Sequence, residues 1–377
     1  MGKAPTVFDL FCGAGGLSLG FQQADFRVLG GNDFFKSAGQ TFSNAHENSK
    51  FYDMPIQELK GNHILSDMSM KRGDLDCLVG GPPCQAYSVY NHKRSMDDER
   101  ANLFKEYLRI VDELYPKWIV IENVTGIKSI DNGQVIETIR TELNDRGYEI
   151  EVKTLFAEDY GIPQERRRVI FLGNRINAPI HWPKKTHTAE NFVTIFDSIS
   201  DLPELENGEK LCDGTYLEKP KSNYQRNIRK NSLKITNHDA PKLGAVNIER
   251  LKFIKPGGSW RDIPHDLLPN GMKSAKRSDH TKRYGRMKWD GMSCTILTKC
   301  DIHWGAYIHP EQDRAITVRE AARIQGFPDH VEFFGNKTEQ YVQVGNAVPP
   351  ILGKAIAKTI LPTINSIKNS ALNDETV

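Results

Sequence analysis

Apolar residues in the first half of the chain form short runs that alternate with stretches of helical periodicity. The apolar runs, which are typical of buried strands, cover residues 6–12, 27–31, 77–81 and 118–124, with a weaker one near Phe51. The helical periods cover residues 15–24, 34–45, 102–114 and 134–146. This alternation predicts an α/β fold with a mixed, mostly parallel sheet and helices on both faces.

The pattern continues with two strands that should pair with each other, at residues 149–156 and 168–173. The loop between them is too short for a crossover helix, so we expect an antiparallel pair. Helical periods return at 317–325 and at 351–363, and the second of these helices is amphipathic and could dock back on the first domain. We expect the last residues, from about 369, to form a frayed tail.

Between about residue 176 and residue 300 the chain loses this regularity. Prolines, glycines and basic residues separate short strand-like pieces such as 293–298. Residues 219–300 contain 19 Lys and Arg against 6 Asp and Glu, a net charge of +13, whereas the whole chain carries +2. A basic segment on an acidic body indicates a surface that faces a polyanion, and a solvated loop region is the alternative. We predict a discontinuous first domain, residues 1–176 with 314–377, and a smaller irregular domain, residues 177–313.

Composition narrows the class of protein further. No apolar run approaches the roughly 20 residues of a membrane helix, and we expect no signal peptide. The 6 cysteines form no C-x-x-C pair, which favours the reducing cytoplasm. Cys294, Cys300 and His303 lie close in sequence, but their spacing is not that of a usual zinc site, so no metal is expected.

The first candidate motif is Asp9-Leu-Phe-Cys-Gly-Ala-Gly-Gly-Leu-Ser, in which a strand runs through a glycine turn into a helix. Such a turn lets the backbone approach a cofactor closely. Ser18 stands where the dinucleotide fingerprint has its third glycine, and Asp33 follows at the end of the second strand, where an acid can bind ribose hydroxyls. By itself the motif indicates an adenosine-type cofactor or a tight turn equally.

Two further motifs end neighbouring strands. Gly80-Gly-Pro-Pro-Cys-Gln places Cys84 in a proline-stiffened loop beyond the carboxyl end of the sheet, where ligands bind in open α/β folds. A lone cysteine is usually a small core residue, but a polar loop suits an active site better. Glu122-Asn-Val ends the strand at 118–124, and a helix cap or structural hydrogen bond is its alternative role. Parallel strands should bring Cys84 and Glu122 to one edge of the sheet.

The fourth motif, Gln164-Glu-Arg-Arg-Arg, leads into the strand at 168–173. Arg166 and Arg168 should alternate with Arg167 across the faces of the sheet, so one face could point two guanidinium groups into the site. The alternative is a charged run on the surface.

Together these motifs resemble the DNA (cytosine-5)-methyltransferases, in the order and at the separations of that family. Arg319-Glu-Ala-Ala-Arg-Ile-Gln-Gly-Phe-Pro and Gln343-Val-Gly-Asn-Ala-Val-Pro agree with it as well. The resemblance covers about residues 7–173 and 314–357. It implies a Rossmann-like domain that depends on S-adenosylmethionine, interrupted by a variable target-recognition domain at 177–313.

The resemblance also implies a reaction. Cys84 would attack carbon 6 of a flipped-out cytosine as a thiolate, so that carbon 5 can accept a methyl group. Glu122 would hold or protonate ring nitrogen 3, and Asn123 would position that carboxylate. Arg166 would contact the base or the nearby backbone with support from Arg168, and a bound water could remove the proton from carbon 5.

The cofactor implied is S-adenosylmethionine, which leaves as S-adenosylhomocysteine. The resemblance assigns its pocket to the glycine turn, the ends of the second and third strands and two later segments. These residues are Phe11, Gly13, Gly15, Asp33, Phe34, Asp53, Met54, Leu103, Asn346 and Val348. Of these, Asp33 would bind the ribose and Phe34 would stack on the adenine.

Duplex DNA with a specific short site is the partner implied. Gln85 and Ser88 in the cysteine loop are expected to contact it, and the basic segment should supply the contacts to phosphates. The expected phosphate contacts are Arg226, Arg229, Lys230, Lys273, Lys276, Arg277, Lys282, Arg283 and Arg286. A compact bacterial chain of this kind is expected to be a monomer, accompanied by a restriction endonuclease for the same site without a stable complex.

Three alternatives remain beside this interpretation. A tRNA cytosine-5 methyltransferase shares the same core, but its Cys-Phe-Thr signature is not found here. A nicotinamide oxidoreductase is disfavoured by Ser18 and by the Pro-Pro-Cys loop. An inactive homologue that acts by binding alone is disfavoured by the presence of Cys84, Gln85, Glu122 and Asn123.

Overall fold

The computed structural model describes residues 4–83, 102–211 and 213–374. The chain divides into two compact units. The first unit comprises Met1–Phe156, Arg167–Lys185 and Val348–Val377, and the second comprises Ala157–Arg166 and Thr186–Ala347.

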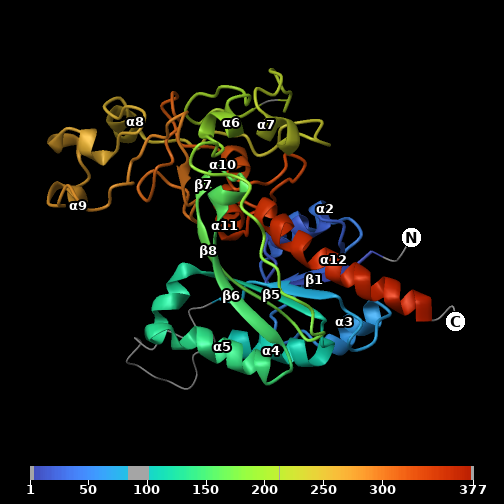
Figure 1. Cartoon of the computed structure of the whole chain (residues 1–377). Coiled ribbons are helices and arrows are strands. Elements are labelled where there is room, and N and C mark those ends of the chain that lie inside the picture. The colour runs from blue at the N-terminus through green and yellow to red at the C-terminus, as the bar shows by residue number, and fades with distance from the viewer. Residues whose placement is uncertain (1–3, 84–101, 212, 375–377) are drawn as a thin grey trace. The chain divides into compact units, whose positions relative to one another are not determined.

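The first unit is built on a seven-stranded sheet with the order β3-β2-β1-β4-β5-β8-β6 (Figure 1). Its strands are β1 (Thr6–Leu10), β2 (Arg27–Asp33), β3 (Lys50–Asp53), β4 (Cys77–Gly80), β5 (Trp118–Val124), β6 (Glu149–Phe156) and β8 (Arg167–Asn174). Neighbours from β3 to β5 pair in parallel, whereas β8 is antiparallel to both β5 and β6. The predicted mixed, mostly parallel sheet and its antiparallel pair are therefore confirmed.

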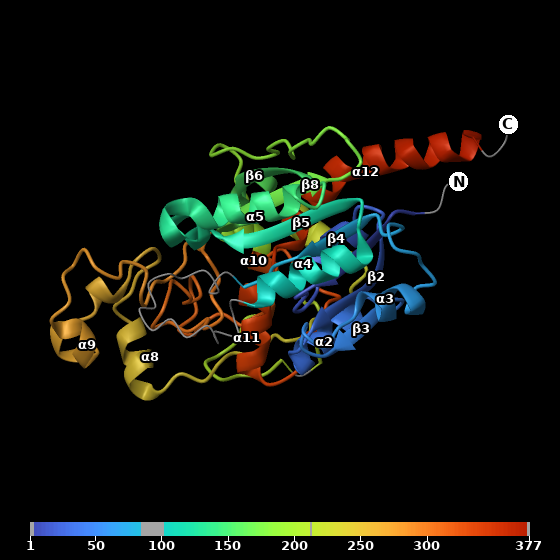
Figure 2. The ribbon, with the colours of Figure 1, turned by 90° about the horizontal axis from the view of Figure 1, so that it is seen from below.

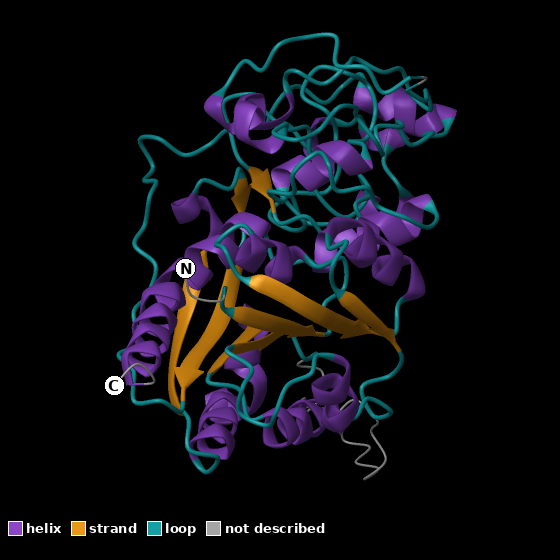
Figure 3. Ribbon diagram, turned by 90° about the vertical axis from the view of Figure 1, so that its right-hand side faces the viewer, coloured by secondary structure: helices purple, strands orange, loops and turns teal. Residues whose placement is uncertain are grey.

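Helices cover both faces of this sheet, as the alternation in the sequence predicts. They are α1 (Gly16–Gln22), α2 (Lys36–Ala45), α3 (Gly61–Asp67), α4 (Asn102–Leu114), α5 (Gln134–Asn144) and α12 (Pro350–Asp374), with the 3-10 turn η2 (Thr125–Gly133). Figure 2 shows α3, α4 and α5 following one another across one face, and Figure 1 shows α2 and α12 on the other. Figure 3 shows the strands in orange between these two layers of helices.

The last helix completes the first unit, although its sequence follows that of the second unit. A Cβ atom at Gly20 of α1 would lie 2.4 Å from the carbonyl oxygen of Pro350, so α1 and α12 pack at backbone contact. The helix predicted at 351–363 is confirmed and is longer than predicted, with Pro362 in its interior. Within the described residues, no helix is both long and apolar enough to cross a lipid bilayer.

Parallel pairing puts the carboxyl ends of four strands at one edge of the sheet. β1 ends before the glycine turn, β2 ends at Asp33, β4 ends before Gly81 and β5 ends at Val124. The strands themselves are almost wholly buried, because their apolar side chains meet helices on both faces. The candidate residues therefore follow rigid strands at the edge where open α/β folds bind ligands.

The second unit has little regular secondary structure. Its elements are η3 (Ala157–Tyr160), β7 (Gln164–Glu165), α6 (Ile195–Ile199), α7 (Asn223–Ile228), α8 (Ala245–Leu251), η4 (Trp260–Asp262), η5 (His265–Leu267), α9 (Asn270–Lys273), β9 (Ser293–Cys294), α10 (Val318–Ile324) and α11 (Lys337–Asn346). The strand predicted at 293–298 is only two residues long and pairs in parallel with β7. A separate apolar core around Leu251, Trp260 and Ile302 explains how such an irregular chain stays compact.

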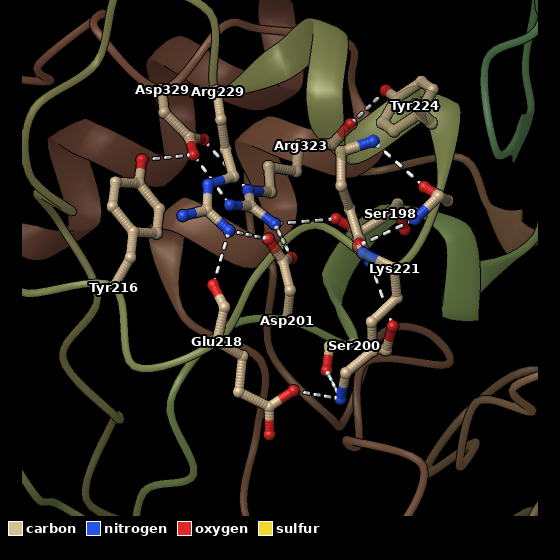
Figure 4. Close-up of polar contacts among 12 residues, drawn as sticks. Ser198, Ser200, Asp201, Tyr216, Glu218, Lys221, Tyr224, Arg229, Arg323 and Asp329 are labelled. Atoms are coloured by element: carbon tan, nitrogen blue, oxygen red, sulfur yellow. Dashed lines mark hydrogen bonds and ion pairs between the residues drawn. The ribbon is translucent and has the colours of Figure 1, made fainter.

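Buried charges replace part of the apolar core in this unit (Figure 4). Arg323 of α10 donates to Asp201 at 2.5 Å and to Asp329 at 2.7 Å, and none of these three side chains is exposed. Burial alone would raise the pKa of Asp329, but the field and hydrogen bonds of Arg323, together with Arg319, lower it. Each carboxylate is thus satisfied, as a buried charge must be.

Residues 314–347 pack with the second unit, although the sequence analysis joined them to the first domain. Arg319 donates to the carbonyl oxygens of Thr236 and Val331, and Arg323 donates to that of Ser198. These side chains tie α10 to the chain between α6 and Thr236, which sequence periodicity could not reveal. The division into catalytic and target-recognition domains remains a prediction about function.

The second unit is expected to lose stability as the pH falls below neutrality. Burial lowers the pKa of His309 to about 4, and Nδ1 of this side chain accepts hydrogen bonds from the backbone N–H groups of Glu311 and Gln312. In the unfolded chain the imidazole of His309 binds a proton near pH 6.5, whereas in the folded chain it stays neutral until about pH 4. The free energy of unfolding therefore decreases as the pH falls from 6.5 toward 4. We expect a loss of about 2 kcal/mol between pH 6.5 and 5.

Denaturant unfolding at pH 7 and pH 5 measures this loss. The His309→Gln variant should show a smaller difference between the two pH values, whereas the exposed His265→Gln control should behave like the native protein. Equal stability of the native protein at both pH values would contradict the assignment.

Candidate active site

Glu122 and Arg168 form an ion pair at the carboxyl edge of the first unit. Glu122 lies near the end of β5 and Arg168 near the start of β8, and the antiparallel register sets Arg168 opposite Val124. Arg168 Nε lies 2.5 Å from Glu122 Oε1, and both side chains are almost wholly buried. The partner that a carboxylate needs at the end of a buried strand is therefore Arg168.

The other carboxylate oxygen faces the loop that leads to Cys84. A Cβ atom at Gly81 would lie 3.0 Å from Glu122 Oε2, so the glycine leaves room for this oxygen. Asn123 Nδ2 donates to the carbonyl oxygen of Pro82 at 3.0 Å, and its Oδ1 accepts from the N–H of Val124 at 2.9 Å. The end of β5 thus holds the loop in place two residues before the cysteine.

Cys84 itself lies outside the described residues, as do Gln85 and Ser88. The structure brings together Glu122, Asn123 and Arg168 with the first part of the cysteine loop. Gly81 is a residue that the sequence analysis missed, and its signal was the Gly-Gly pair at the end of a buried strand.

The glycine turn after β1 has a backbone that favours glycine. Gly13 and Gly15 have φ angles of +51° and +78°, and Phe11 before them has +55°. A Cβ atom at Gly15 would lie 2.8 Å from the ring of Phe42 and from His46 Nε2. Nothing lies within 4 Å of a Cβ position at Gly13, so the turn is supported from α2 and open at that position.

Asp33 links the glycine turn to the end of β2. Its Oδ2 accepts from the N–H of Gly13 and its Oδ1 from the N–H of Phe35, both at 2.9 Å. Burial raises the pKa of Asp33, although these backbone hydrogen bonds oppose the rise. Each oxygen keeps acceptor capacity, because a carboxylate oxygen has two lone pairs.

Phe34, directly after Asp33, is 72% exposed. An exposed phenylalanine beside a half-buried carboxylate suits a ligand with an aromatic ring and adjacent hydroxyls. The other residues of the first unit that are expected in the pocket lie at these places. Phe11, Met54 and Leu103 all pack against the same apolar cluster, Asp53 lies exposed at the end of β3 in register with Asp33, and Val348 is buried.

Asn346 is placed in the second unit, exposed at the end of α11. The residues of the first unit fit an adenosine-type cofactor by their chemistry. The carboxylate of Asp33 can accept hydrogen bonds from a sugar diol, and the ring of Phe34 can stack on a purine.

Arg166 differs from the expectation for the three arginines. It lies between β7 and β8, which belong to different units, so the alternation along one strand does not apply to it. Its buried guanidinium donates to the carbonyl oxygens of Ile296 at 3.2 Å, Gly345 at 3.0 Å and Ala347 at 2.9 Å. Arg166 therefore positions main chain in the second unit, and Arg168 pairs with Glu122.

Two of the expected phosphate contacts serve the interior of the second unit instead. Arg286 is 5% exposed and donates to the carbonyl oxygens of Leu251, Ile254 and His309. Arg229 bonds Asp201 Oδ2 at 2.8 Å and stacks on Tyr216 (Figure 4). Charge counts cannot separate such side chains from solvated ones.

The other expected phosphate contacts reach the surface. Arg226, Lys230, Lys273, Lys276, Arg277 and Lys282 are exposed, and Arg283 is half-buried. Lys282 Nζ lies 4.0 Å from Glu165, at the limit of an ion pair. These side chains stay available to a polyanion.

The model of the C-5 cytosine-specific DNA methylase family matches residues 6–362. This match spans nearly the whole chain and both units. The protein belongs to the C-5 cytosine-specific DNA methylase family.

Relatives agree with this membership over most or all of their length. The type II methyltransferase M.AgeI of Thalassovita gelatinovora is 32% identical over 95% of this chain and 100% of its own. The type II methyltransferase M.DdeI of Desulfomicrobium norvegicum is 33% identical over 97% of this chain and 91% of its own. A solved structure described as a DNA modification methyltransferase encoded within a prophage of E. coli has a TM-score of 0.76 and 25% identity, covering 96% of this chain and 100% of that one.

Because the protein belongs to this methylase family, the role of Asp33 can be tested by measuring its binding of S-adenosylmethionine. The Asp33→Ala variant should bind it more weakly by about 1.5–3 kcal/mol, the range for a hydrogen bond to a charged group. Titration calorimetry measures the change, with the exposed Asp74→Ala variant as a matched control. Unchanged affinity in Asp33→Ala would count against this pocket.

Proposed function

We propose that this methylase transfers a methyl group from S-adenosylmethionine to carbon 5 of a cytosine flipped out of a specific short site in duplex DNA. The observation that carries the proposal is the cluster of Glu122, Asn123 and Arg168 beside the loop that leads to Cys84. The type II relatives favour this reaction over methylation of a tRNA.

The chemistry starts from the weakness of carbon 5 of cytosine as a nucleophile. The Cys84 thiolate attacks carbon 6, which makes carbon 5 resemble an enamine carbon. Glu122 holds or protonates ring nitrogen 3 and so relieves the negative charge that the attack develops on the ring. After methylation, a base removes the carbon 5 proton, and the electron pair of that bond expels the thiolate from carbon 6. A bound water is the proposed base.

The residues around Glu122 fix the position of its carboxylate and of the nearby loop. Arg168, 2.5 Å from Oε1, fixes one carboxylate oxygen and leaves Oε2 on the side of Gly81. Asn123 fixes the loop at Pro82, the last residue but one before Cys84 in the sequence.

The cofactor pocket is proposed on the first unit. Asp33 binds the ribose hydroxyls, Phe34 stacks on the adenine, and Asp53 and Met54 meet the adenine edge. The glycine turn from Phe11 to Gly15 lies under the methionine and sugar, and Leu103 and Val348 close the pocket. S-Adenosylmethionine supplies the methyl group as a sulfonium, and no metal is required for this transfer.

Recognition of DNA is proposed for the second unit, with Gln85 and Ser88 of the cysteine loop as further contacts. The exposed lysines and arginines of the basic segment would neutralise phosphates, which position the protein without reading bases. We propose a monomeric protein of the bacterial cytoplasm, acting beside a restriction endonuclease for the same site without a stable complex.

Bisulfite sequencing tests the function directly. Unmethylated genomic DNA is incubated with the protein and S-adenosylmethionine, and protected cytosines should share one short sequence context. The Glu122→Gln variant and a reaction without cofactor are the controls. Protection of a tRNA cytosine in place of DNA cytosines would establish the alternative reaction and overturn this one.

A further inference from the structure

Trp304 of the second unit is an exposed tryptophan that has no role in the proposed function. Its side chain is 51% exposed, whereas Trp118 and Trp260 are buried. Tryptophan is highly buried on average, so an indole that stands half in solvent calls for an explanation.

The backbone that carries Trp304 is held firmly. Ile302, two residues earlier, is fully buried in the apolar core of the second unit. The side chain of Asp301 accepts a hydrogen bond from the backbone N–H of His303 at 2.8 Å. The carbonyl oxygen of Asp301 accepts one from the backbone N–H of Trp304 at 2.9 Å. The exposure of the indole therefore belongs to an ordered turn, as is usual for a side chain that meets a partner.

A second apolar side chain, Leu297, is presented from the same support and is 43% exposed. The buried Tyr307 hydroxyl accepts from the N–H of Leu297 at 3.2 Å and donates to the carbonyl oxygen of Thr295 at 2.7 Å. A Cβ atom at Gly305, next to Trp304, would lie 2.9 Å from that same hydroxyl. The backbones at Leu297 and Gly305 thus meet at one buried group.

Positive charge surrounds the indole. The guanidinium carbon of Arg283 lies 4.9 Å from the ring centroid of Trp304, and Lys299 Nζ lies 5.8 Å from it. Both cations belong to the basic segment with its net charge of +13. An apolar ring framed by cations complements a partner that offers flat π surfaces beside negative charges, which is the chemistry of a nucleic acid.

Resting on the proposed function, we propose that Trp304 stacks on a base of the target duplex that loses its neighbour when the cytosine is flipped out. Base flipping exposes π surface and costs stacking free energy, which an aromatic side chain can recover. Arg283 and Lys299 neutralise the adjoining phosphates, and Leu297 packs beside the indole. Trp304 is then a positioning residue for the flipped state of the duplex.

The test uses the full-length protein and the site that bisulfite sequencing defines. Affinity is measured by fluorescence anisotropy for the native duplex and for duplexes in which one base at a time, other than the target cytosine, is replaced by an abasic residue. Trp304→Ala should weaken binding to the native duplex about 10- to 100-fold, the range for loss of one stacked base, whereas Trp304→Phe should lose much less. At one abasic position the effect of Trp304→Ala should fall below about twofold, because the stacked base is already missing.

Lys276→Ala is the matched control, because loss of a phosphate contact should weaken every duplex in the series by the same factor. Trp304→Leu serves in the same comparison if Trp304→Ala fails to bind S-adenosylmethionine like the native protein. The stacking role is overturned if Trp304→Ala and Trp304→Leu bind the native duplex like the native protein. It is also overturned if they lose affinity equally on every duplex. If the variants give either of these results and the native protein methylates its site, this inference alone is refuted. A native protein that neither methylates nor binds DNA refutes the proposed function as well.

Discussion

Turnover is expected to fall by several orders of magnitude when Cys84 is replaced by serine. A hydroxyl is far less ionised at neutral pH than a thiol and is the weaker nucleophile, so attack on carbon 6 becomes the limiting step. Binding of S-adenosylmethionine should stay unchanged, because the proposed pocket residues Asp33 and Phe34 follow another strand. Single-turnover methylation of a duplex with the mapped site measures the loss.

A duplex with 5-fluorocytosine at the target position gives the second readout. Fluorine at carbon 5 cannot leave as a proton does, so the native protein should stay covalently bound through sulfur. Cys84→Ser should give no adduct, whereas Cys77→Ser, at a buried cysteine of β4, should still give one. An adduct that mass spectrometry maps to any other residue would refute the assignment of Cys84.

The second large effect is expected for Glu122→Gln. General acid–base catalysis by one positioned side chain contributes about 10²- to 10⁴-fold, and we expect a loss of turnover in that range. Glutamine keeps the size of the side chain, but it cannot donate a proton to ring nitrogen 3 as a carboxylic acid does. The adduct with 5-fluorocytosine should therefore form far more slowly.

Two comparisons separate this effect from damage to the fold. Glu149→Gln replaces an exposed carboxylate on β6, which is separated from β5 by β8, and should leave turnover unchanged. Glu122→Gln removes the ionic partner of Arg168, so its thermal unfolding and cofactor affinity must be recorded beside its activity. Turnover within about threefold of native in a folded Glu122→Gln variant would exclude the role given to this carboxylate.

Much of the first unit could be predicted from its sequence because its strands are buried on both faces. The run Trp118–Val124 is rich in β-branched residues and ends in a carboxylate, so both the strand and the position of Glu122 at its end followed from the pattern. Asp33 was found in the same way, from its place at the end of β2, whereas Phe34 was suggested by the family resemblance. Such predictions succeed because parallel pairing alone brings strand ends to one edge.

The second unit could be predicted much less well, and the reasons are physical. The polar sequence of α11 has little apolar periodicity, and its first turn is fixed by Asn336 and Glu339 in a capping box. Arg286 and Lys282 are equally basic in the sequence, yet one is buried against carbonyl oxygens and the other is exposed. Tertiary contacts decide such cases, and no local pattern reports them.

The contacts of Arg166 bear on which replacements the second unit can accept. Arg166 donates to main-chain carbonyl oxygens at Ile296, Gly345 and Ala347, and every amino acid supplies such an oxygen. A foreign segment grafted in place of residues 186–347 would offer Arg166 the same acceptors wherever its backbone follows the same path. The anchor is thus indifferent to the side chains at Ile296 and Ala347, whereas a Cβ atom at Gly345 would lie 2.5 Å from the backbone of Leu297 and Thr298.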